Sequence, residues 1–374
     1  MRVAILTSGR FHVCDLAREL DTLGHVVSFY SCVPKVVTRR FGLPDRCNQS
    51  LFPYLAPLFF LMRKTQHSAL GPAMEQLFIR ALDALAARVV GPCDLFIGMS
   101  GMSTKTALAI RRRYGGKVWI ERGSRHILSQ KEILDALPGS QRVARFAVER
   151  ELADYELADT IVVPSLHVER SFVERGVPRE KLFRNPYGVD LAMFPRTPKP
   201  QNLVPTLVFA GAWSLRKGCD VLAKAIEGQP WKLVHVGPTG DAALPKETNF
   251  ESRGVVAQSR LFEVYAEADV FVQPSREEGL SLVQAQSLAS GLPLVCTDRT
   301  GGEDLAEFLG APSWVTVVPH DDPAALRQGI KQALSLAGNQ FGLRDTLGSA
   351  HERLTWKAYG QRYDTEIKNR CFAS

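Results

Sequence analysis

Short apolar runs alternate with amphipathic runs along the first half of the chain. Residues 2–7 form a β-branched apolar run. Residues 12–23 then place apolar side chains at helical spacing, and Gly24 stops the predicted helix. The same alternation predicts further strands at residues 26–30, 95–98, 118–121 and 160–163, and further helices at residues 73–90, 103–113 and 141–157. It favours a parallel sheet whose two faces are covered by helices.

A second series follows a linker-like stretch at residues 196–205, which contains proline and lysine. It predicts strands at residues 206–210, 232–236, 270–273 and 293–296, and helices at residues 219–227, 259–267, 280–290 and 322–336. The two series together predict an α/β protein with two Rossmann-like parallel-sheet domains that face each other across a cleft. Parallel sheets bind ligands at the carboxyl ends of their strands, so we expect the functional site in that cleft.

The composition is that of an ordered globular protein, with 45% hydrophobic and 23% charged residues. The formal net charge is +7, but residues 1–190 carry 27 Lys and Arg against 19 Asp and Glu, so the basic excess lies in the first half. Such an excess attracts anionic partners such as nucleic acid, a membrane surface or an anionic substrate. A plain solvated surface explains the excess equally well.

The seven cysteines are scattered, and no two of them form a CxxC pair. This spacing fits neither a zinc site nor a disulfide framework, so we expect no metal and a reducing compartment. The chain starts with a strand-like run rather than with a basic and apolar leader, which predicts a cytoplasmic protein.

The strongest chemical signal is the stretch PSREEGLSLVQAQSLASG at residues 274–291. A polar turn follows the predicted strand, and the next helix begins after Gly279, so free backbone N–H groups at the helix start suit a phosphate. The carboxylate of Glu278, beside the turn, can accept hydrogen bonds from the hydroxyl groups of a sugar. The alternative interpretation is that Glu278 and Ser281 only cap the helix.

A second signal is the loop GAWSLRKG at residues 211–218, which follows the first strand of the second series. Arg216 offers a planar fork and Lys217 a point charge, and together they suit a diphosphate. Fixed cations that stabilise a departing diphosphate lower the reaction barrier without a metal. The alternative is a solvated loop with two exposed cations.

Together these two stretches resemble glycosyltransferase family 4, which has the GT-B fold. The resemblance extends over the whole chain and is stronger in the C-terminal half. The family's KG loop, its PSxxEGxxLVxxEAxAxGxPVV pattern and its GG-x-x-E-like turn correspond to residues 208–218, 274–295 and 300–303. The family's crossover segment, its "lvxpxDpeaL" stretch and its final helix are similar to residues 158–194, 317–326 and 356–363. The resemblance implies an N-terminal acceptor domain over residues 1–195, a donor domain over residues 196–355 and a helix that crosses back over residues 356–374.

The resemblance also implies a role for each matching residue. Lys217 binds the donor diphosphate with help from Arg216, and Glu278 contacts the transferred sugar. The remaining donor-binding positions are Gly9, Gly237, Gly279, Leu280, Ser281, Leu282 and Gln286. The implied reaction transfers a sugar from a UDP- or GDP-linked donor with retention of anomeric configuration. It requires no metal, no further cofactor and no covalent nucleophile.

Three positions depart from the family pattern. The second glutamate of the pattern, which holds the ribose hydroxyls, is Gln286 here, and an amide still makes hydrogen bonds that are weaker by roughly 1 kcal/mol. The arginine of the family's glycine-rich loop is replaced by Ala212, and Arg216 is its expected substitute. The asparagine before Gly188 is replaced by Tyr187.

The acceptor side is marked by fewer residues. Residues 120–126 (IERGSRH) follow a predicted strand, and a histidine near this place in relatives contacts the transferred sugar, which makes His126 a catalytic candidate. A shift of the alignment gives this place to Arg122 or Ser124, and a lone histidine is also common as a structural residue. Arg10 beside Gly9 suits an anionic acceptor or is a solvated loop residue.

The most apolar window, at residues 51–62, precedes Arg63 and Lys64. It is too short to span a membrane, and it carries two prolines. It either packs in the core or touches the inner face of a membrane peripherally. The expected acceptor is a glycan, a lipid-linked glycan or a small molecule, and no nucleic acid partner is expected.

Other nucleotide-binding classes fit less well. The turn at Gly9 lacks the GxGxxG of a dehydrogenase, and the chain has no GxxxxGK[ST] of a P-loop enzyme. Two alternatives remain open: a sugar-nucleotide epimerase, and a catalytically weak GT-B protein that only binds a nucleotide sugar.

Overall fold

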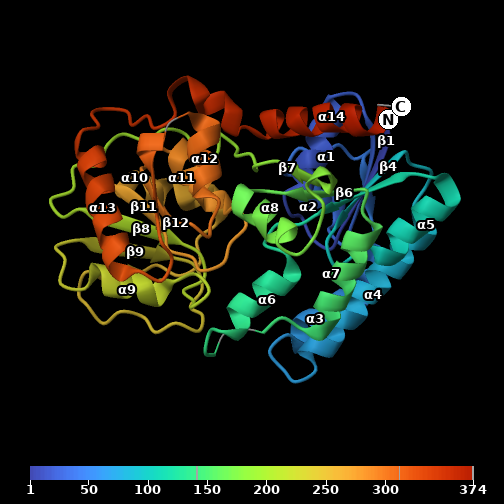
Figure 1. The fold of residues 1–374 in the computed structure, drawn as a ribbon, viewed down its shortest axis with the longest axis horizontal. Coiled ribbons are helices and arrows are strands. Elements are labelled where there is room, and N and C mark those ends of the chain that lie inside the picture. The colour runs from blue at the N-terminus through green and yellow to red at the C-terminus, as the bar shows by residue number, and fades with distance from the viewer. Residues whose placement is uncertain (140–141, 311, 373–374) are drawn as a thin grey trace.

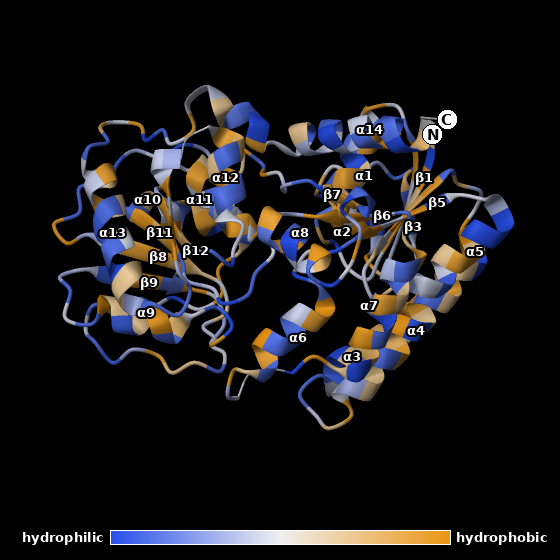
Figure 2. Ribbon diagram, in the orientation of Figure 1, coloured by the Kyte–Doolittle hydropathy of each residue, from blue (hydrophilic) through white to orange (hydrophobic). Residues whose placement is uncertain are grey.

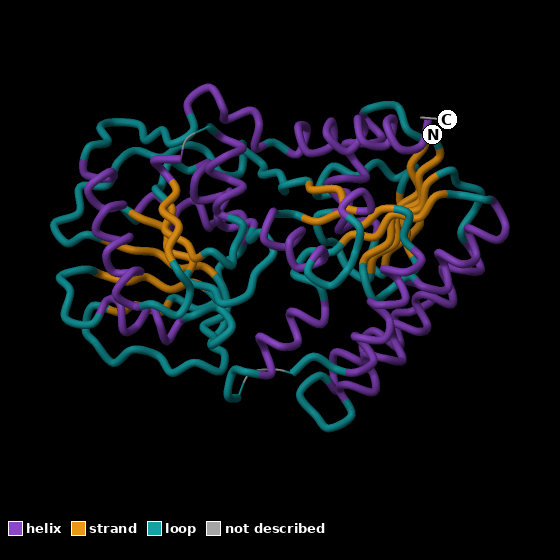
Figure 3. Tube along the Cα trace, viewed as in Figure 1, coloured by secondary structure: helices purple, strands orange, loops and turns teal. Residues whose placement is uncertain are grey.

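The computed structural model describes residues 1–139, 142–310 and 312–372. It contains one parallel sheet in each half of the chain, with helices around each sheet (Figure 1, Figure 3). The first sheet has the strand order β3-β2-β1-β4-β5-β6-β7. Its strands are β1 (Arg2–Thr7), β2 (Val26–Ser31), β3 (Asn48–Ser50), β4 (Leu95–Met99), β5 (Lys117–Glu121), β6 (Thr160–Val163) and β7 (Leu182–Arg184).

The central strands of this sheet are buried along almost their whole length, and Figure 2 shows that they are mostly hydrophobic. Both features are typical of a parallel sheet covered on both faces. The helices of this domain contact its strands or pack on one another. They are α1 (Val13–Thr22), α2 (Lys35–Arg39), α3 (Phe52–Thr65), α4 (Gly71–Val89), α5 (Thr104–Tyr114), α6 (Ile127–Asp135), α7 (Arg145–Leu157) and α8 (Leu166–Val173).

The second sheet has the strand order β10-β9-β8-β11-β12-β13, again with parallel pairs. Its strands are β8 (Thr206–Ala210), β9 (Lys232–Val236), β10 (Phe250–Ser252), β11 (Val270–Gln273), β12 (Leu294–Thr297) and β13 (Val315–Val318). Its helices are α9 (Cys219–Ile226), α10 (Leu261–Glu267), α11 (Leu282–Ala289), α12 (Gly302–Leu309) and α13 (Pro323–Gly338). The prediction of two parallel-sheet α/β domains is confirmed.

The last helix, α14 (Trp356–Phe372), leaves the second domain and packs on α1 of the first (Figure 1). The Tyr363 ring lies 5.4 Å from the ring of Trp119 on β5. The side-chain amide of Asn185 donates to the carbonyl of Tyr359 at 3.3 Å. These contacts hold α14 against the first domain.

Candidate functional site

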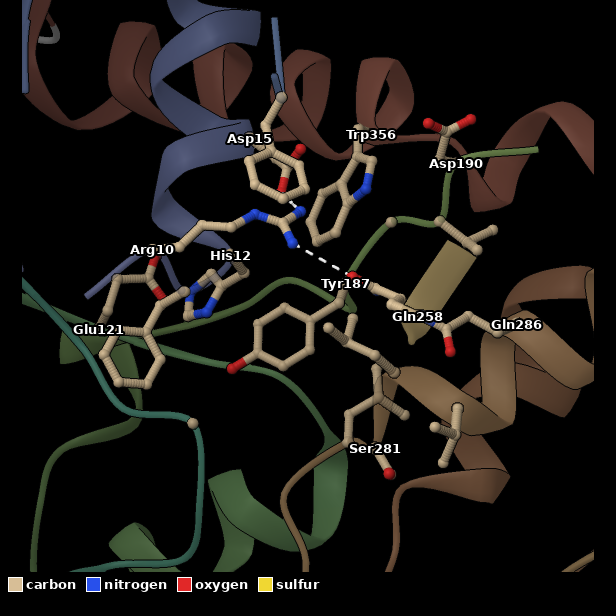
Figure 4. Close-up of a pocket in the computed structure, with 18 of the residues that line it drawn as sticks. Arg10, His12, Asp15, Glu121, Tyr187, Asp190, Gln258, Ser281, Gln286 and Trp356 are labelled. Carbon is tan, nitrogen blue, oxygen red and sulfur yellow. Dashed lines mark hydrogen bonds and ion pairs between the residues drawn. The ribbon is translucent and has the colours of Figure 1, made fainter. Parts of the chain in front are cut away.

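A cavity of about 920 Å³ lies between the two domains, at the carboxyl ends of β4 and β5 on one side and beyond the end of β11 on the other. Both domains contribute to its wall. Among the labelled side chains in Figure 4, those from the first domain include Arg10, His12, Asp15, Glu121 and Tyr187, and those from the second are Gln258, Ser281 and Gln286. The cavity therefore lies where two facing parallel sheets are expected to bind a ligand.

The loop at residues 211–218 and the turn at residues 274–281 meet beside this cavity. Gly218 has a positive φ of 66°, and a Cβ placed on it would lie 2.0 Å from the carbonyl oxygen of Pro274, so only glycine allows this approach. The Nζ of Lys217 forms an ion pair with Glu278. The Arg216 guanidinium donates to the Glu277 carbonyl at 3.0 Å. The structure thus joins the two stretches that the sequence singled out.

The turn itself forms part of the cavity wall. Glu278, Leu280, Ser281, Leu282 and Gln286 all line the cavity, with the last two on helix α11. The amide oxygen of Gln286 is buried and has no hydrogen-bond partner among the residues that the structure describes. A donor hydroxyl that reached this oxygen would satisfy it.

Gly279 lies at the contact between the domains rather than in the cavity wall. A Cβ placed on it would lie 1.9 Å from the carbonyl oxygen of Gly123, so the backbone of the turn touches the first domain. The hydroxyl of Ser165 donates to the Gly279 carbonyl at 2.9 Å. Contacts with the first domain therefore fix the backbone of the turn at Gly279.

Lys217 and Arg216 lie behind Glu278 and are not part of the cavity wall in this structure. Lys217 is 8% exposed. Burial and the neighbouring charge of Arg216 lower the pKa of the Lys217 ammonium to about 7. Glu278 is the anion beside this ammonium, and a diphosphate would add a second negative charge that stabilises the charged forms of Lys217 and Arg216.

Glu277 is a site residue that sequence reasoning missed. It is fully buried and links the domains: its carboxylate accepts from Ser124 and Gln130 of the first domain, and it lies 3.3 Å from the Arg216 guanidinium. Burial opposes its ionisation, but the hydrogen bonds and the charge of Arg216 hold the pKa of this carboxyl below its usual range. The only hint of Glu277 in the sequence was its position directly before Glu278, which the sequence analysis had singled out.

His126 does not reach the cavity, so the prediction that it faces the acceptor is wrong. Its ring packs against Tyr155 and Phe172 with centroids 5.1 Å and 5.0 Å away, and its Nδ1 accepts from the backbone N–H of Leu128. Burial and nearby arginines lower the pKa of His126 to about 4. It is a structural residue that caps the start of α6.

The other two residues considered for this place have separate positions. Arg122 lines the cavity, with its Nε 3.1 Å from a carboxylate oxygen of Glu151. Ser124 is bound to Glu277, as described above. Of the three residues considered for this place, Arg122 is thus the one that lines the cavity.

Arg10 extends across the cavity between the domains (Figure 4). Its guanidinium lies 3.3 Å from Asp15, donates to the Gln258 side chain at 3.2 Å and stacks over the Phe41 ring at 3.4 Å. Gly9 and Gly237 are not in the cavity wall. A Cβ on Gly237 would lie 2.0 Å from the carbonyl oxygen of Gly211, so glycine at this position allows the two backbone segments to approach closely.

The histidine that does face the cavity is His12, which sequence reasoning also missed. Its Nε2 lies 3.0 Å from a carboxylate oxygen of Glu121, and its ring lies 4.4 Å from the Tyr187 ring. The Tyr363 hydroxyl of α14 donates to Glu121 at 2.8 Å. The sequence signal was its position three residues after Gly9, at the start of α1.

Comparison with known proteins finds a family match in the second domain. Residues 204–335 match the family model described as Glycosyl transferases group 1. These residues form a group 1 glycosyltransferase domain. The resemblance to glycosyltransferase family 4 is confirmed by this match and by curated relatives of the same type.

Two curated relatives are similar to less than half of the chain. A GDP-mannose-dependent alpha-mannosyltransferase from Mycobacterium tuberculosis is 31% identical over 163 residues, which cover 40% of this chain and 42% of the relative. A D-inositol 3-phosphate glycosyltransferase from an Arthrobacter species is 30% identical over 200 residues, which cover 43% of this chain and 47% of the relative. The match thus spans less than half the length of each relative. Their names support the prediction of a glycosyltransferase.

Solved structures resemble the whole chain. Sucrose-phosphate synthase from Thermosynechococcus elongatus has a TM-score of 0.68 at 19% identity and covers 100% of both chains. Anabaena HepE in complex with UDP and glucose has a TM-score of 0.65 at 12% identity and covers 99% of this chain and 100% of its own. At these identities the likeness concerns the fold, which is the two-domain GT-B fold that carries the group 1 glycosyltransferase domain here.

Proposed function

We propose that the protein transfers a sugar from a UDP- or GDP-linked donor to an acceptor in the interdomain cavity, with retention of anomeric configuration and without a metal. One observation carries this proposal: Arg216, Lys217 and Glu278 lie together where the two loops meet at the cavity. Two cations beside a carboxylate suit a diphosphate attached to a sugar. The nucleotide-sugar relatives support the donor class.

In the proposed reaction the bond between the anomeric carbon and the diphosphate oxygen breaks, and Lys217 and Arg216 stabilise the charge that develops on the leaving group. The acceptor hydroxyl forms its new bond to the same carbon from the same face. Its proton passes to the departing diphosphate oxygen, so charge and atoms balance. Glu278 orients the sugar through its hydroxyls, and no protein group forms a covalent intermediate.

A donor panel tests the proposal. The purified protein is incubated with UDP- and GDP-sugars, and release of UDP or GDP by slow donor hydrolysis is measured. Proton NMR of the sugar then gives its anomeric configuration. Binding without release of any nucleotide would identify the alternative, a GT-B protein that binds a nucleotide sugar without transferring it. An epimerised sugar still attached to its nucleotide would identify an epimerase.

The acceptor proposed for this site carries an anionic group. Arg10, Arg18 and Arg40 line the same part of the cavity, and among the carboxylates there Asp15 is shared between Arg10 and Arg18. The Nε of Arg10 is buried and has no hydrogen-bond partner in the described parts of the chain. A phosphate or carboxylate on the acceptor would satisfy it.

Gln286→Glu is expected to keep nucleotide affinity or to raise it up to about fivefold, because a carboxylate makes stronger hydrogen bonds to ribose hydroxyls by roughly 1 kcal/mol. Gln286→Leu, which removes the unpartnered amide oxygen, is expected to weaken binding. Calorimetric titration with UDP and GDP measures both effects. A large loss of affinity in Gln286→Glu would mean that the amide itself is required.

We also propose that helix α3 docks on an anionic membrane surface. Of its fourteen residues only Leu55 is fully buried, whereas Tyr54 is 72% and Phe60 61% exposed. Arg63 and Lys64 follow in the last turn, where they would meet anionic lipid headgroups. No helix in the described part of the chain is long and apolar enough to cross a membrane. A docked helix would bring the cavity close to a lipid-linked acceptor.

Sedimentation with lipid vesicles tests this docking. The wild-type protein is expected to pellet with phosphatidylglycerol vesicles, and the double variant Tyr54→Ser/Phe60→Ser is expected to lose at least three quarters of that binding. Phe341→Ser is the matched control because Phe341 is 85% exposed on the second domain. Equal binding of the wild-type protein and the double variant would exclude α3 as the docking element.

A further inference from the structure

A second pocket at the domain boundary, of about 380 Å³, shares no residue with the cavity described above. It is formed by the segment before α6, by α6 itself, by the end of α8 and by the loop after β12. Three arginines and two glutamates dominate its wall, which is made of Arg125, Ser129, Glu132, Ile133, Glu174, Arg175 and Arg299.

Two of the three arginines make no side-chain hydrogen bond to any residue that the structure describes. Arg175 is bound to Glu132 and donates to the Ser129 hydroxyl at 3.1 Å. The Nε of Arg125, by contrast, is buried with no hydrogen-bond partner among the described residues, and its nearest carboxylate oxygen, on Glu174, is 3.8 Å away. The Arg299 guanidinium has no hydrogen bond or ion pair to any residue that the structure describes.

Glu174 is largely exposed and lies 3.8 Å from Arg125, and two other acidic residues nearby are bound to other groups. Asp298 is paired with His320 at 2.9 Å, and Glu277 is bound to Arg216 and to Ser124. Burial and the charge of Arg299 together lower the pKa of Arg125 below its usual range. The pocket therefore holds two guanidinium groups, one from each domain, whose positive charges are not fully compensated.

We propose that this pocket binds a phosphate group, which is held by Arg125 of the first domain and Arg299 of the second. Guanidinium groups present paired N–H donors that match phosphate oxygens. The ligand is either inorganic phosphate or a phosphate monoester, because both present the same oxygens. The proposal concerns binding and does not depend on the proposed transfer reaction.

The pocket is connected to the donor turn through the backbone. The N–H of Glu278 donates to the carbonyl of Arg299 at 3.1 Å, and Arg125 follows directly after Ser124, which binds Glu277. A phosphate that bridges Arg125 and Arg299 would stabilise the arrangement in which the domains meet at this turn. Its binding should therefore raise the affinity for UDP by about fivefold, and UDP should raise the affinity for phosphate equally.

Equilibrium dialysis with radiolabelled inorganic phosphate tests the site, first without UDP and then with UDP at saturation to fill the donor site. We expect one phosphate site to remain in the presence of UDP. Arg125→Gln and Arg299→Gln should each weaken it at least tenfold. Arg112→Gln, a substitution of an exposed arginine on α5, is the control and should leave it unchanged. Circular dichroism confirms that the variants are folded.

Each other outcome overturns the proposal. These are absence of phosphate binding at millimolar concentration, unchanged binding in Arg299→Gln, and an equal loss in Arg112→Gln, which would indicate a general charge effect. Competition with glycerol 3-phosphate distinguishes the two ligand sources: stronger binding than inorganic phosphate identifies a phosphate monoester. Failure of UDP to bind at all would contradict the donor proposal alone, because the phosphate titration without UDP is read independently.

Discussion

Lys217→Ala is expected to lower kcat/KM for sugar transfer at least a hundredfold. The ammonium lies beside Glu278, where the diphosphate leaving group is proposed to develop its charge, and one such preorganised donor is worth on the order of 3 kcal/mol. The fold should survive, because burial already lowers the pKa of the ammonium to about 7, and its partner Glu278 lines the cavity, where water can hydrate the carboxylate once the ammonium is removed. Steady-state kinetics with the donor from the panel gives the loss, and thermal unfolding checks the fold.

Lys224→Ala is the matched control, since Lys224 is an exposed lysine at the end of α9 in the same domain. It should keep wild-type activity. Glu278→Ala should lower kcat/KM as much as Lys217→Ala does, but for a different reason: the transferred sugar would lose the carboxylate that accepts its hydrogen bonds. Near-normal turnover in either site variant would mean that the donor binds elsewhere.

The second large effect is expected for stability. Glu277→Ala should lower the free energy of unfolding by about 3 kcal/mol, because it leaves Arg216, Ser124 and Gln130 without their shared buried partner. Glu277→Gln should cost less, since the amide oxygen still accepts from Ser124 while the charge for Arg216 is lost. Urea unfolding followed by circular dichroism gives both values.

Glu263→Ala serves as the control for Glu277→Ala. Glu263 lies on the surface of α10, and among the residues that the structure describes its carboxylate pairs only with Arg260, so its removal should leave the unfolding midpoint unchanged. An unchanged midpoint for Glu277→Ala would show that the contact between the domains at this carboxylate does not contribute to stability. Transfer activity of Glu277→Gln separately reports whether the carboxylate positions Arg216.

The sequence predicted the two sheets because apolar periodicity is a local property. Residues 2–7 and 206–210 are apolar runs of the kind that a sheet covered on both faces requires, and they form β1 and β8 with bounds within one residue of those expected. The pairing of the loop at 211–218 with the turn at 274–281 followed as well, because both stretches come after neighbouring strands of one sheet.

Only the tertiary structure decided which side chains face the cavity. His12 and His126 both follow a strand in the sequence, but contacts with Tyr155 and Phe172, distant along the chain, bury His126, whereas His12 is held at the cavity by Glu121. No local pattern encodes such contacts.

The adjacent residues Glu277 and Glu278 also show that the sequence alone does not reveal which side chains face the cavity. Adjacent side chains separate, so Glu278 reaches the cavity while Glu277 enters the contact with the first domain. The lowered pKa of Lys217 and the only partly compensated charge of Arg125 also depend on residues that are distant along the chain. The sequence by itself determined the two sheets and singled out the two loops that are proposed to bind the diphosphate, because their signals are local. Tertiary packing decided the roles of the individual charges, because burial and pairing depend on residues brought together from both domains.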